Sequence, residues 1–372
     1  MSDFPPAEFL GRLRRAQQGA AEQGIAALLV TPGPNFRYLT GYNADASSER
    51  ITCLVAPAEG DPMLLVPELE VPLARSTTAG ELGIEIVEWR ETEDSIGRLV
   101  GMLPRSATRL ALDDHMWAVR VLDLRRRLPD VEQVAAGPVV SPLRIRKTPA
   151  EADALRRAGA AIDRVHEQVP GFLRPGRTER EVGKDIADAI LAAGHATVDF
   201  VIIGSGPNGA SPHAEVSDRV IRPGEPVVVD IGGAMPDGYF SDSTRTYCIG
   251  EPPKEFQAYY ELLREAQIAQ CAAAGPGITA ADLDALGRDM IADAGYGPNF
   301  IHRTGHGIGL EVHEEPYIVA TNPAVLEVGM AFSIEPGIYL KGRHGARIED
   351  IVVCTEEGNE PCNLRPKELA IV

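Results

Sequence analysis

The first 140 residues alternate short apolar runs with longer stretches in which apolar residues recur every three or four positions. The short runs are rich in β-branched side chains and predict strands, at residues 25–31, 51–56, 63–67, 84–89 and 110–112. The amphipathic stretches predict helices, at residues 9–23, 92–103 and 118–128. The Pro/Gly-rich residues 31–42 predict a loop. This alternation is typical of an α/β domain.

A domain boundary is expected where this alternation stops, near residues 144–148. Thr148 is followed three residues later by Glu151, which is the pattern of a capping box, and Pro149 suits the first turn of a helix. A long helix should therefore run from Pro149 to about residue 169. At 372 residues the chain is also long for one core. We expect one domain at residues 1–143 and a second at residues 144–372.

The second domain contains an internal repeat. The sequence Pro-Gly-x-Thr at residues 175–178 returns at residues 276–279, and each copy precedes a helical stretch that ends in Ala-Gly. His213-Ala-Glu returns in the same order as His313-Glu-Glu. Each copy has the pattern of a Thr-capped helix that ends at glycine. The repeat predicts two quasi-equivalent halves, each a helix pair with antiparallel strands.

The first half carries two acidic residues on one predicted hairpin. Residues 226–233 and 239–248 predict strands, and the Ala-Met-Pro-Asp-Gly sequence between them is typical of a turn. Folding the hairpin about Pro236 places Asp230 opposite Asp242. Directly paired residues have Cβ atoms ~5 Å apart, so the two carboxylates would repel each other unless a cation lay between them.

The second half repeats this arrangement. Residues 330–335 and 346–354 predict strands around a glycine-containing turn. Folding this hairpin about Gly342 places Glu335 opposite Glu349. Four carboxylates are more than one ion needs, whereas two bridged divalent ions would use them all.

A fifth ligand is expected in the segment IHRTGHGIGLEVHEEP, which contains His302, His306 and His313. Its glycines disfavour a regular helix and allow close backbone approach. The predicted metal ligands are Asp230, Asp242, His306, Glu335 and Glu349. A mostly oxygen set with one imidazole favours two Mn²⁺ ions, with Co²⁺ or Zn²⁺ as alternatives.

Charge and cysteine content narrow the class of protein. The chain has 36 basic and 54 acidic side chains, a net charge of −18, which disfavours nucleic acid or an anionic membrane as partner. No apolar run approaches the ~20 residues of a membrane span, and the start lacks the apolar core of a signal peptide. The five cysteines include no C-x-x-C pair. We expect a cytoplasmic protein with reduced thiols.

Five segments resemble the five-ligand signature of the pita-bread metallopeptidases, with Xaa-Pro dipeptidase (prolidase) and Xaa-Pro aminopeptidase as the most similar members: VVVDIGG, FSDSTRT, HRTGHGIG, SIEPGIY and ARIED. This resemblance covers roughly residues 150–372. Residues 1–140 resemble the creatinase-like domain of the group more weakly, through Asn35 and Tyr38-Leu39-Thr40-Gly41. The implied fold, α/β plus α+β, is a small N-terminal creatinase-like α/β domain followed by a pseudo-two-fold pita-bread catalytic domain. Relatives of this kind commonly form homodimers.

The resemblance also implies a role for each ligand. Asp230 would chelate the first ion, while His306 and Glu335 hold the second. Asp242 and Glu349 would bridge the two ions. A hydroxide between the ions would be the nucleophile, and Glu335 would carry its proton to the leaving nitrogen.

Other positions that match the family are His213, His302, His313 and Arg347. His313, together with His213, would donate to the oxyanion, and His302 would line the space for the proline ring. Several dipeptidases have an arginine at the position of Tyr317. Arg347, Tyr317 and Tyr339 are therefore candidates for binding the substrate carboxylate.

The expected reaction is hydrolysis of the peptide bond before proline in dipeptides or short peptides. The alternatives are an Xaa-Pro aminopeptidase on longer peptides and a small-amide hydrolase of the creatinase or ectoine hydrolase type. A methionine aminopeptidase fits less well, because the leading domain is unexpected there. A non-catalytic binding protein on this scaffold predicts lost ligands, and all five are present.

Overall fold

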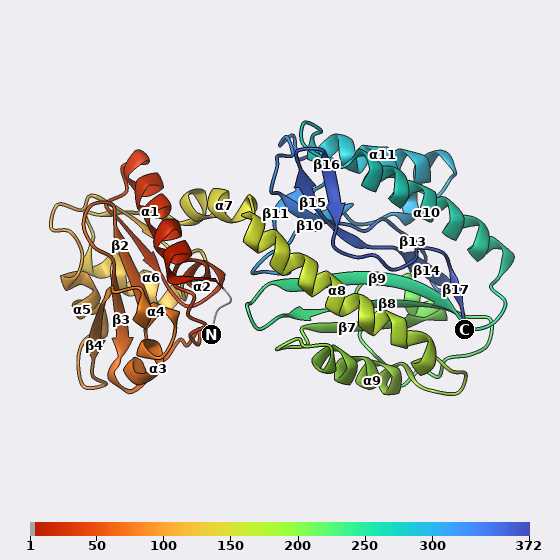
Figure 1. Cartoon of the computed structure of the whole chain (residues 1–372), viewed down its shortest axis with the longest axis horizontal. Helices are drawn as coiled ribbons and strands as arrows, with labels where there is room; N and C mark the ends of the chain where they lie inside the picture. The colour runs from red at the N-terminus through yellow and green to blue at the C-terminus, as the bar shows by residue number, and fades with distance from the viewer. Residues whose placement is uncertain (1–3) are drawn as a thin grey trace. The chain divides into compact units, whose positions relative to one another are not determined.

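The structure is a computed structural model that describes residues 4–372. The chain divides into two compact units, Met1–Arg144 and Ile145–Val372 (Figure 1). No helix among the described residues combines the length and the apolar character that a membrane span needs.

The first unit is built on a six-stranded mixed sheet with the order β4-β3-β2-β1-β5-β6. Strands β1, β2 and β3 are antiparallel neighbours, whereas the outer pairings are parallel. The strands are β1 (Ala27–Val30), β2 (Cys53–Pro57), β3 (Met63–Pro67), β4 (Glu85–Trp89), β5 (Arg109–Leu112) and β6 (Glu132–Ala135). The helices are α1 (Pro6–Glu22), α2 (Pro34–Thr40), η1 (Glu68–Glu70), α3 (Val71–Arg75), α4 (Thr78–Glu81), α5 (Ser95–Gly101), α6 (Ala118–Arg127) and α7 (Gly137–Ile145). All five predicted strands and all three predicted helices are present in this α/β unit.

Helix α2 lies where the sequence predicted a loop, so that prediction was wrong. Pro34 occupies its first turn, and Gly41, with φ 67°, ends it in the left-handed conformation. Phe36 and Leu39 are buried between these ends. The Pro and Gly residues therefore punctuate the two ends of a short helix.

Helix α8 (Pro149–Phe172) opens the second unit and begins with the predicted capping box. The Thr148 side chain accepts from the Glu151 amide, and the Glu151 carboxylate accepts from the Thr148 amide. The helix continues a few residues beyond the predicted end, through Pro170. Proline cannot donate to the carbonyl four residues earlier, and here the Tyr247 hydroxyl donates to that carbonyl, on His166, at 3.2 Å.

The rest of the second unit consists of two similar halves. In the first half, the sheet β17-β9-β8-β7 packs with α8 and α9. In the second half, the sheet β11-β10-β12-β15-β16 packs with α10 and α11. A separate hairpin joins β13 to β14. The remaining bounds are α9 (Glu179–Ala192), β7 (Phe200–Ser205), η2 (Gly206–Ala210), β8 (Pro226–Ala234), β9 (Phe240–Cys248), α10 (Lys254–Ala273), α11 (Ala280–Asp293), η3 (Gly297–Asn299), β10 (Gly305–Gly307), β11 (Glu314–Ile318), β12 (Ala331–Ile334), β13 (Gly337–Leu340), β14 (His344–Arg347), β15 (Asp350–Thr355), β16 (Gly358–Pro361) and β17 (Ala370–Ile371).

The two halves use the same local contacts. Thr178 caps α9 and forms an isolated bridge with Val220, while Thr279 caps α11 and forms the matching bridge with Val325. In each half the central strand, β8 or β12, has antiparallel neighbours on both sides, β7 and β9 or β10 and β15. The predicted duplication is therefore confirmed.

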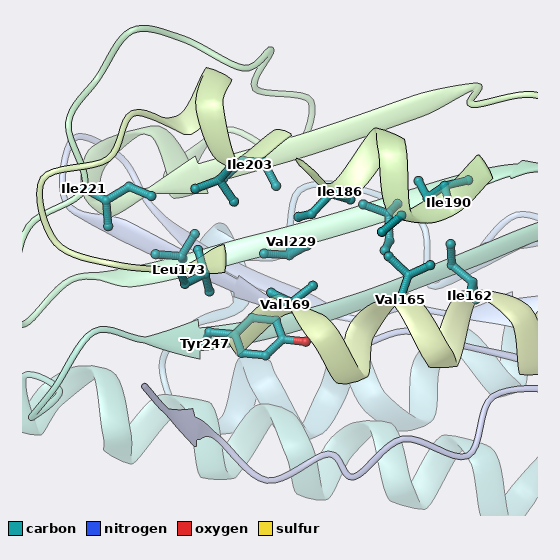
Figure 2. Packing of buried hydrophobic residues seen from close by; sticks show 14 of the residues in the cluster. Ile162, Val165, Val169, Leu173, Ile186, Ile190, Ile203, Ile221, Val229 and Tyr247 are labelled. Atoms are coloured by element: carbon teal, nitrogen blue, oxygen red, sulfur yellow. The ribbon is translucent and has the colours of Figure 1, made fainter. Parts of the chain in front are cut away.

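The core of the first half fixes the strand that carries the first acidic residue. Val165 and Val169 of α8 and Ile186 of α9 pack against Val229 of β8 (Figure 2). All four side chains are fully buried. Because successive side chains on a strand point to opposite faces, burying Val229 against the helices turns Asp230 to the other face of the sheet.

Candidate metal centre

The hairpin of β8 and β9 brings Asp230 and Asp242 onto one face, but in a different register from the predicted one. Asp230 pairs with Thr244, and Asp242 pairs with Gly232. The turn is centred on Asp237, because the Met235 amide bonds to the Tyr239 carbonyl. The predicted centre, Pro236, was one residue too early, and this shifted the pairing by two. A shift of two keeps both acids on one face, as diagonal neighbours.

The second hairpin keeps the predicted register on both sides of its acids. Ile334 pairs with Asp350 in β12 and β15, and Gly337 pairs with Arg347 in β13 and β14. Glu335 and Glu349 occupy the gap between these two ladders, outside the named strands. The ladder of backbone hydrogen bonds between the two strands is therefore interrupted at the two predicted ligands.

At this break the second hairpin bonds to its neighbours instead. The Glu335 amide donates to the Thr304 carbonyl at 2.8 Å, and the Glu349 amide donates to the Thr244 carbonyl of β9 at 3.1 Å. The Thr244 hydroxyl donates to the Glu349 carboxylate at 2.7 Å. Glu349, from the second half, is thus held by the strand that carries Asp242, from the first half.

Three of the five predicted ligands already form a compact group. Ligand atoms of Asp242, His306 and Glu349 all lie within 4.8 Å of one another. The Nε2 atom of His306 is 3.6 Å from an Asp242 oxygen and 3.1 Å from a Glu335 oxygen. On the other side of the ring, Nδ1 lies 3.1 Å from the Gly307 carbonyl, which can only accept. The Nδ1 proton therefore belongs to that bond, and the Nε2 lone pair faces the carboxylates.

Asp230 completes the set at a second position. Its Oδ1 atom is buried and has no hydrogen-bond partner among the described residues, while Oδ2 accepts from Arg347. A buried carboxylate oxygen without a donor is costly unless a cation meets it. This orphaned oxygen and the Nε2 lone pair of His306 are the observations that fit the site to divalent cations.

The carboxylates of this cluster have displaced pKa values. Burial, followed by repulsion from Asp230 and Glu335, raises the pKa of Asp242 well above its ordinary value. Burial and repulsion from Asp242 raise the pKa of Glu349 in the same direction. Burial alone would also raise the pKa of Glu335, but His306, when it carries a second proton on Nε2, outweighs burial together with the charges of His302 and Arg347 and lowers that pKa to about 2. Positive charge placed among these groups would relieve the repulsion.

The cluster opens into a cavity of about 600 Å³. All five predicted ligands line it, together with His213, His302, His313 and Arg347. Its remaining lining includes Phe200, Ile202 and Val312, which give it an apolar wall. Tyr317 and Tyr339 are not among its lining residues. The cavity therefore collects every predicted site residue except the two tyrosines.

His302 is held in place by protein groups on both ring nitrogens. Its Nδ1 atom donates to the Arg303 carbonyl at 2.7 Å, so Nε2 accepts from the Tyr339 hydroxyl at 2.9 Å. Burial lowers the pKa of His302 to about 4. Arg347 donates to the same Tyr339 hydroxyl at 2.7 Å. Tyr339 thus ties a wall histidine to the arginine that bonds Asp230.

His313 is arranged differently. Its ring lies edge-on to the His306 ring, with centroids 4.0 Å apart. Burial, followed by the charge of nearby groups including His306 and Arg303, lowers the pKa of His313 to about 4. Neither His313 nor His213 has a hydrogen-bond partner for its ring among residues 4–372. The uncharged His313 ring is therefore available to donate an N–H into the cavity.

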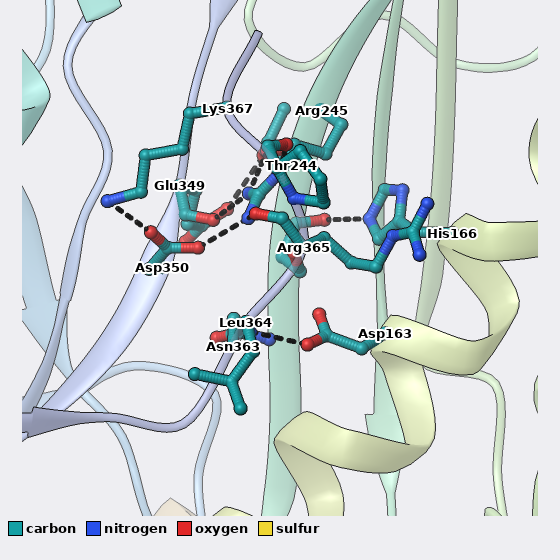
Figure 3. A network of polar contacts seen from close by, with 12 residues as sticks. Asp163, His166, Thr244, Arg245, Glu349, Asp350, Asn363, Leu364, Arg365 and Lys367 are labelled. Carbon is teal, nitrogen blue, oxygen red and sulfur yellow. Dashed lines mark hydrogen bonds and ion pairs between the residues drawn. The ribbon is translucent and has the colours of Figure 1, made fainter. Parts of the chain in front are cut away.

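A polar network behind the cluster holds Glu349 from its backbone side (Figure 3). The Arg245 guanidinium donates to the Glu349 carbonyl at 2.6 Å and to the Asp350 carboxylate at 2.6 Å, and Lys367 lies 2.8 Å from Asp350. Burial alone would raise the pKa of Asp350, but the charges of Arg245 and Lys367 outweigh it and lower that pKa. Arg245 therefore fixes the backbone of a predicted ligand and keeps its neighbour charged.

Sequence reasoning missed Thr244, Arg245, Asp350 and the pocket residue Arg303. Arg245 and Asp350 directly follow Thr244 and Glu349 in the motifs DSTRT and RIED. Neighbours along a strand point to opposite faces, so each motif supplies one residue to the cavity side and one to the network behind it. That alternation was the available signal.

Comparison with known proteins agrees with this geometry. Residues 153–356 match the model of metallopeptidase family M24, and residues 12–146 match the creatinase/prolidase N-terminal domain. The chain belongs to metallopeptidase family M24. The predicted fold class and family are thereby confirmed, and the chain is a metallopeptidase whose family uses divalent metal ions.

Three similar proteins cover almost the whole length of this M24 chain. A probable dipeptidase PepE of Mycobacterium tuberculosis is 50% identical over 369 residues, which are 99% of this chain and 98% of the relative. The crystal structure of dipeptidase PepE from Mycobacterium ulcerans has a TM-score of 0.94 and 51% identity, with 99% of each chain covered. That of a prolidase from Thermococcus sibiricus has a TM-score of 0.92 and 36% identity, with 98% of this chain and 99% of that chain covered.

Proposed function

We propose that this M24 metallopeptidase is an Xaa-Pro dipeptidase that works with two divalent cations. The observation that carries the proposal is the group of Asp242, His306 and Glu349 ligand atoms within 4.8 Å, opening with Asp230 and Glu335 into one cavity. The similarity to a prolidase and to two dipeptidases supports this substrate class.

The donor set supports two ions, for which we propose Mn²⁺. Asp230 and Asp242 would hold one ion, His306 and Glu335 the other, and Asp242 and Glu349 would reach both. One imidazole among carboxylates suits Mn²⁺ better than a thiolate zinc site. When bound, such ions lower the pKa of a water to near 7 and polarise a carbonyl oxygen.

The chain's own groups would do the rest of the chemistry. Glu335 would be the group that takes a proton and passes it to the leaving nitrogen, because its carboxylate lines the cavity and lies 3.1 Å from the Nε2 atom of His306. His313, with its pKa lowered to about 4, is uncharged and donates an N–H to the oxygen that gains charge, assisted by His213. His302, fixed by Tyr339 and the Arg303 carbonyl, forms rigid wall for the proline ring.

Substrate selection would rest on shape. A peptide bond to proline has no N–H to grip, so a pocket must recognise the ring itself. Phe200, Ile202 and Val312 provide apolar surface next to the cluster.

The homodimer and the cytoplasmic location stay predictions.

A substrate panel tests this function. Protein stripped of metal with a chelator and reloaded with Mn²⁺ is assayed on Met-Pro, Met-Ala, a Met-Pro-Ala tripeptide, creatine and ectoine. We expect turnover of Met-Pro above all others, only with metal, and a loss of ~100-fold or more in Glu335→Gln. Glu327→Gln is the matched control, because Glu327 is an exposed partner of Arg146. Preference for the tripeptide would favour an aminopeptidase, and activity only on the last two compounds would contradict peptide hydrolysis.

A further inference from the structure

Two arginine side chains line the cavity, and they differ in how many protein groups they bind. The Arg347 guanidinium is occupied by protein groups, since it bonds to Asp230, Tyr339 and Thr244. The Arg303 guanidinium makes no hydrogen bond and no ion pair with any residue in the described range 4–372, although it lines the same cavity. Arg303 is thus a cationic group of the cavity wall that the protein leaves free for an anion.

Arg303 is nevertheless held in position. Its guanidinium lies over the Tyr317 ring, 4.3 Å from the ring centroid. Tyr317 is anchored by its backbone, because it pairs with the metal-ligand candidate His306 across β10 and β11, and its carbonyl accepts from the Asn322 side chain. When a guanidinium stacks on an aromatic face, its N–H donors lie in the guanidinium plane and point outward past the ring. They therefore stay free to bind a ligand.

The same stack explains the place of Tyr317 in the site. The ring does not line the cavity, and its hydroxyl has no hydrogen-bond partner within the described part of the chain. Its one side-chain contact of note is the face that it offers to Arg303. The structure therefore gives Tyr317 an indirect part, through the arginine that rests on it.

We propose that Arg303 binds the free α-carboxylate of the substrate, and that Tyr317 is the positioning residue that orients its guanidinium. The proposal rests on the proposed function and deepens it, because it assigns the group that would select dipeptides over longer chains. The planar fork of arginine matches a carboxylate with two parallel N–H···O bonds. Arg303 also lies near enough to His313 for its charge to act on that ring, so its ligand would end close to the catalytic groups.

If Arg303 binds the α-carboxylate, the enzyme would select substrates by the distance between that carboxylate and the scissile bond. The ions and their ligands fix where the scissile carbonyl lies, and Arg303 would fix where the chain must end. In a dipeptide the α-carboxylate belongs to the residue just after the scissile bond. In a tripeptide that carboxylate lies one residue further on, and an amide has no charge there at all.

The test compares three substrates that differ only at this end: Met-Pro, Met-Pro-amide and Met-Pro-Ala. Arg303→Gln removes the charge but keeps a polar side chain of similar reach. We expect kcat/KM on Met-Pro to fall about ten- to hundredfold, mainly through KM, since a hydrogen bond to a charged group contributes on that scale. On the amide and the tripeptide we expect less than a threefold change. Arg303→Lys should fall in between, because it keeps the charge without the fork.

Tyr317 supplies the matched pair of variants. Tyr317→Phe keeps the ring and should match the wild type on Met-Pro, whereas Tyr317→Leu removes the platform and should raise KM for Met-Pro alone. Metal content and melting temperature are measured for each variant. Inhibition by proline and by prolinamide gives a second readout, and Arg303→Gln should weaken only proline.

The outcomes separate the two proposals. If wild-type protein cleaves acid and amide equally well, or if Arg303→Gln lowers both by the same factor, the role of Arg303 is refuted while the Xaa-Pro activity stands. If the wild type cleaves no Xaa-Pro bond, the proposed function fails and the role of Arg303 fails with it.

Discussion

Replacing Thr244 by valine removes one hydroxyl group from between two charged residues and keeps the shape of the side chain. That hydroxyl donates to a Glu349 oxygen at 2.7 Å and accepts from Arg347 Nε at 3.1 Å. Thr244 is fully buried, so no water replaces either bond. The variant leaves the carboxylate free to turn and the arginine with an unsatisfied donor.

The expected loss follows from the number and type of these bonds. Removing a group that orients a metal ligand costs about 10–100-fold in metal affinity, which is roughly 1.4–2.8 kcal/mol. The lost hydrogen bonds to charged groups cost about 1.5–3 kcal/mol in folding free energy. We therefore expect both the Mn²⁺ affinity and the unfolding midpoint of Thr244→Val to fall.

Thr246→Val is the control that separates the two effects. Thr246 lies on the same face of β9, is equally buried, and bonds to the Arg347 backbone through its hydroxyl, at 2.9 and 3.2 Å. It should lose stability on a similar scale and keep its metal affinity. Calorimetric titration of metal-free protein with Mn²⁺ measures the affinity, and urea unfolding measures the stability. Equal losses of affinity in both variants, or none in Thr244→Val, would refute the assigned role of the Thr244 hydroxyl.

Two further predictions concern histidines. His313→Ala should lower kcat on Met-Pro about 100–1000-fold at unchanged metal content, as expected for removal of one oxyanion donor, and a loss that is confined to KM would contradict this role. His166 is fully buried, with Nε2 bonded to the Ser243 carbonyl at 3.1 Å, and burial lowers its pKa to about 3. Because its pKa is about 6.5 in the unfolded chain, the unfolded state binds more protons between these values, so stability is full above pH 6.5 and is lost as pH falls towards 3. Between pH 7 and pH 5 this residue should cost about 2 kcal/mol, and His166→Gln should flatten that part of a urea-unfolding pH series; an unchanged slope would show that other groups cause it.

The sequence predicted those parts of the site that depend on local pattern. The strands around Asp230 and Glu335, the Thr caps and the duplication all follow from periods and turn residues within short windows. The four acidic ligands could be chosen because acids inside predicted apolar strands are unusual unless something pairs with them, whereas His306 was chosen from its glycine-rich segment.

What the sequence could not predict depends on tertiary contacts. The predicted centre of the first hairpin's turn was wrong by one residue. Pro236 and Asp237 are both good turn residues, and only the backbone hydrogen bond between Met235 and Tyr239 decides between them. The loop predicted around Phe36 is a helix, because burial of its apolar side chains outweighs its short length.

Tyr317 shows the same limit at the site itself. From the sequence it stood where several dipeptidases have an arginine, so it was a candidate to touch the substrate. In the structure it faces Arg303, a residue of another segment, and lies outside the cavity lining. No local pattern predicts which of two side chains covers the other.

The interruption of strand pairing at Glu335 and Glu349 has a consequence for the stability of the fold. Thr244 and Glu349, whose side chains meet there, are 105 positions apart in the chain. An ion bound to Asp242 and Glu349 would act as a cross-link between the two duplicated halves, closing a loop of about that length. Cross-links that close long loops remove the most conformational freedom from the unfolded chain. The metal centre would then both catalyse the reaction and hold the two halves together. Loss of the ions would weaken the contact between the halves as well as stop turnover.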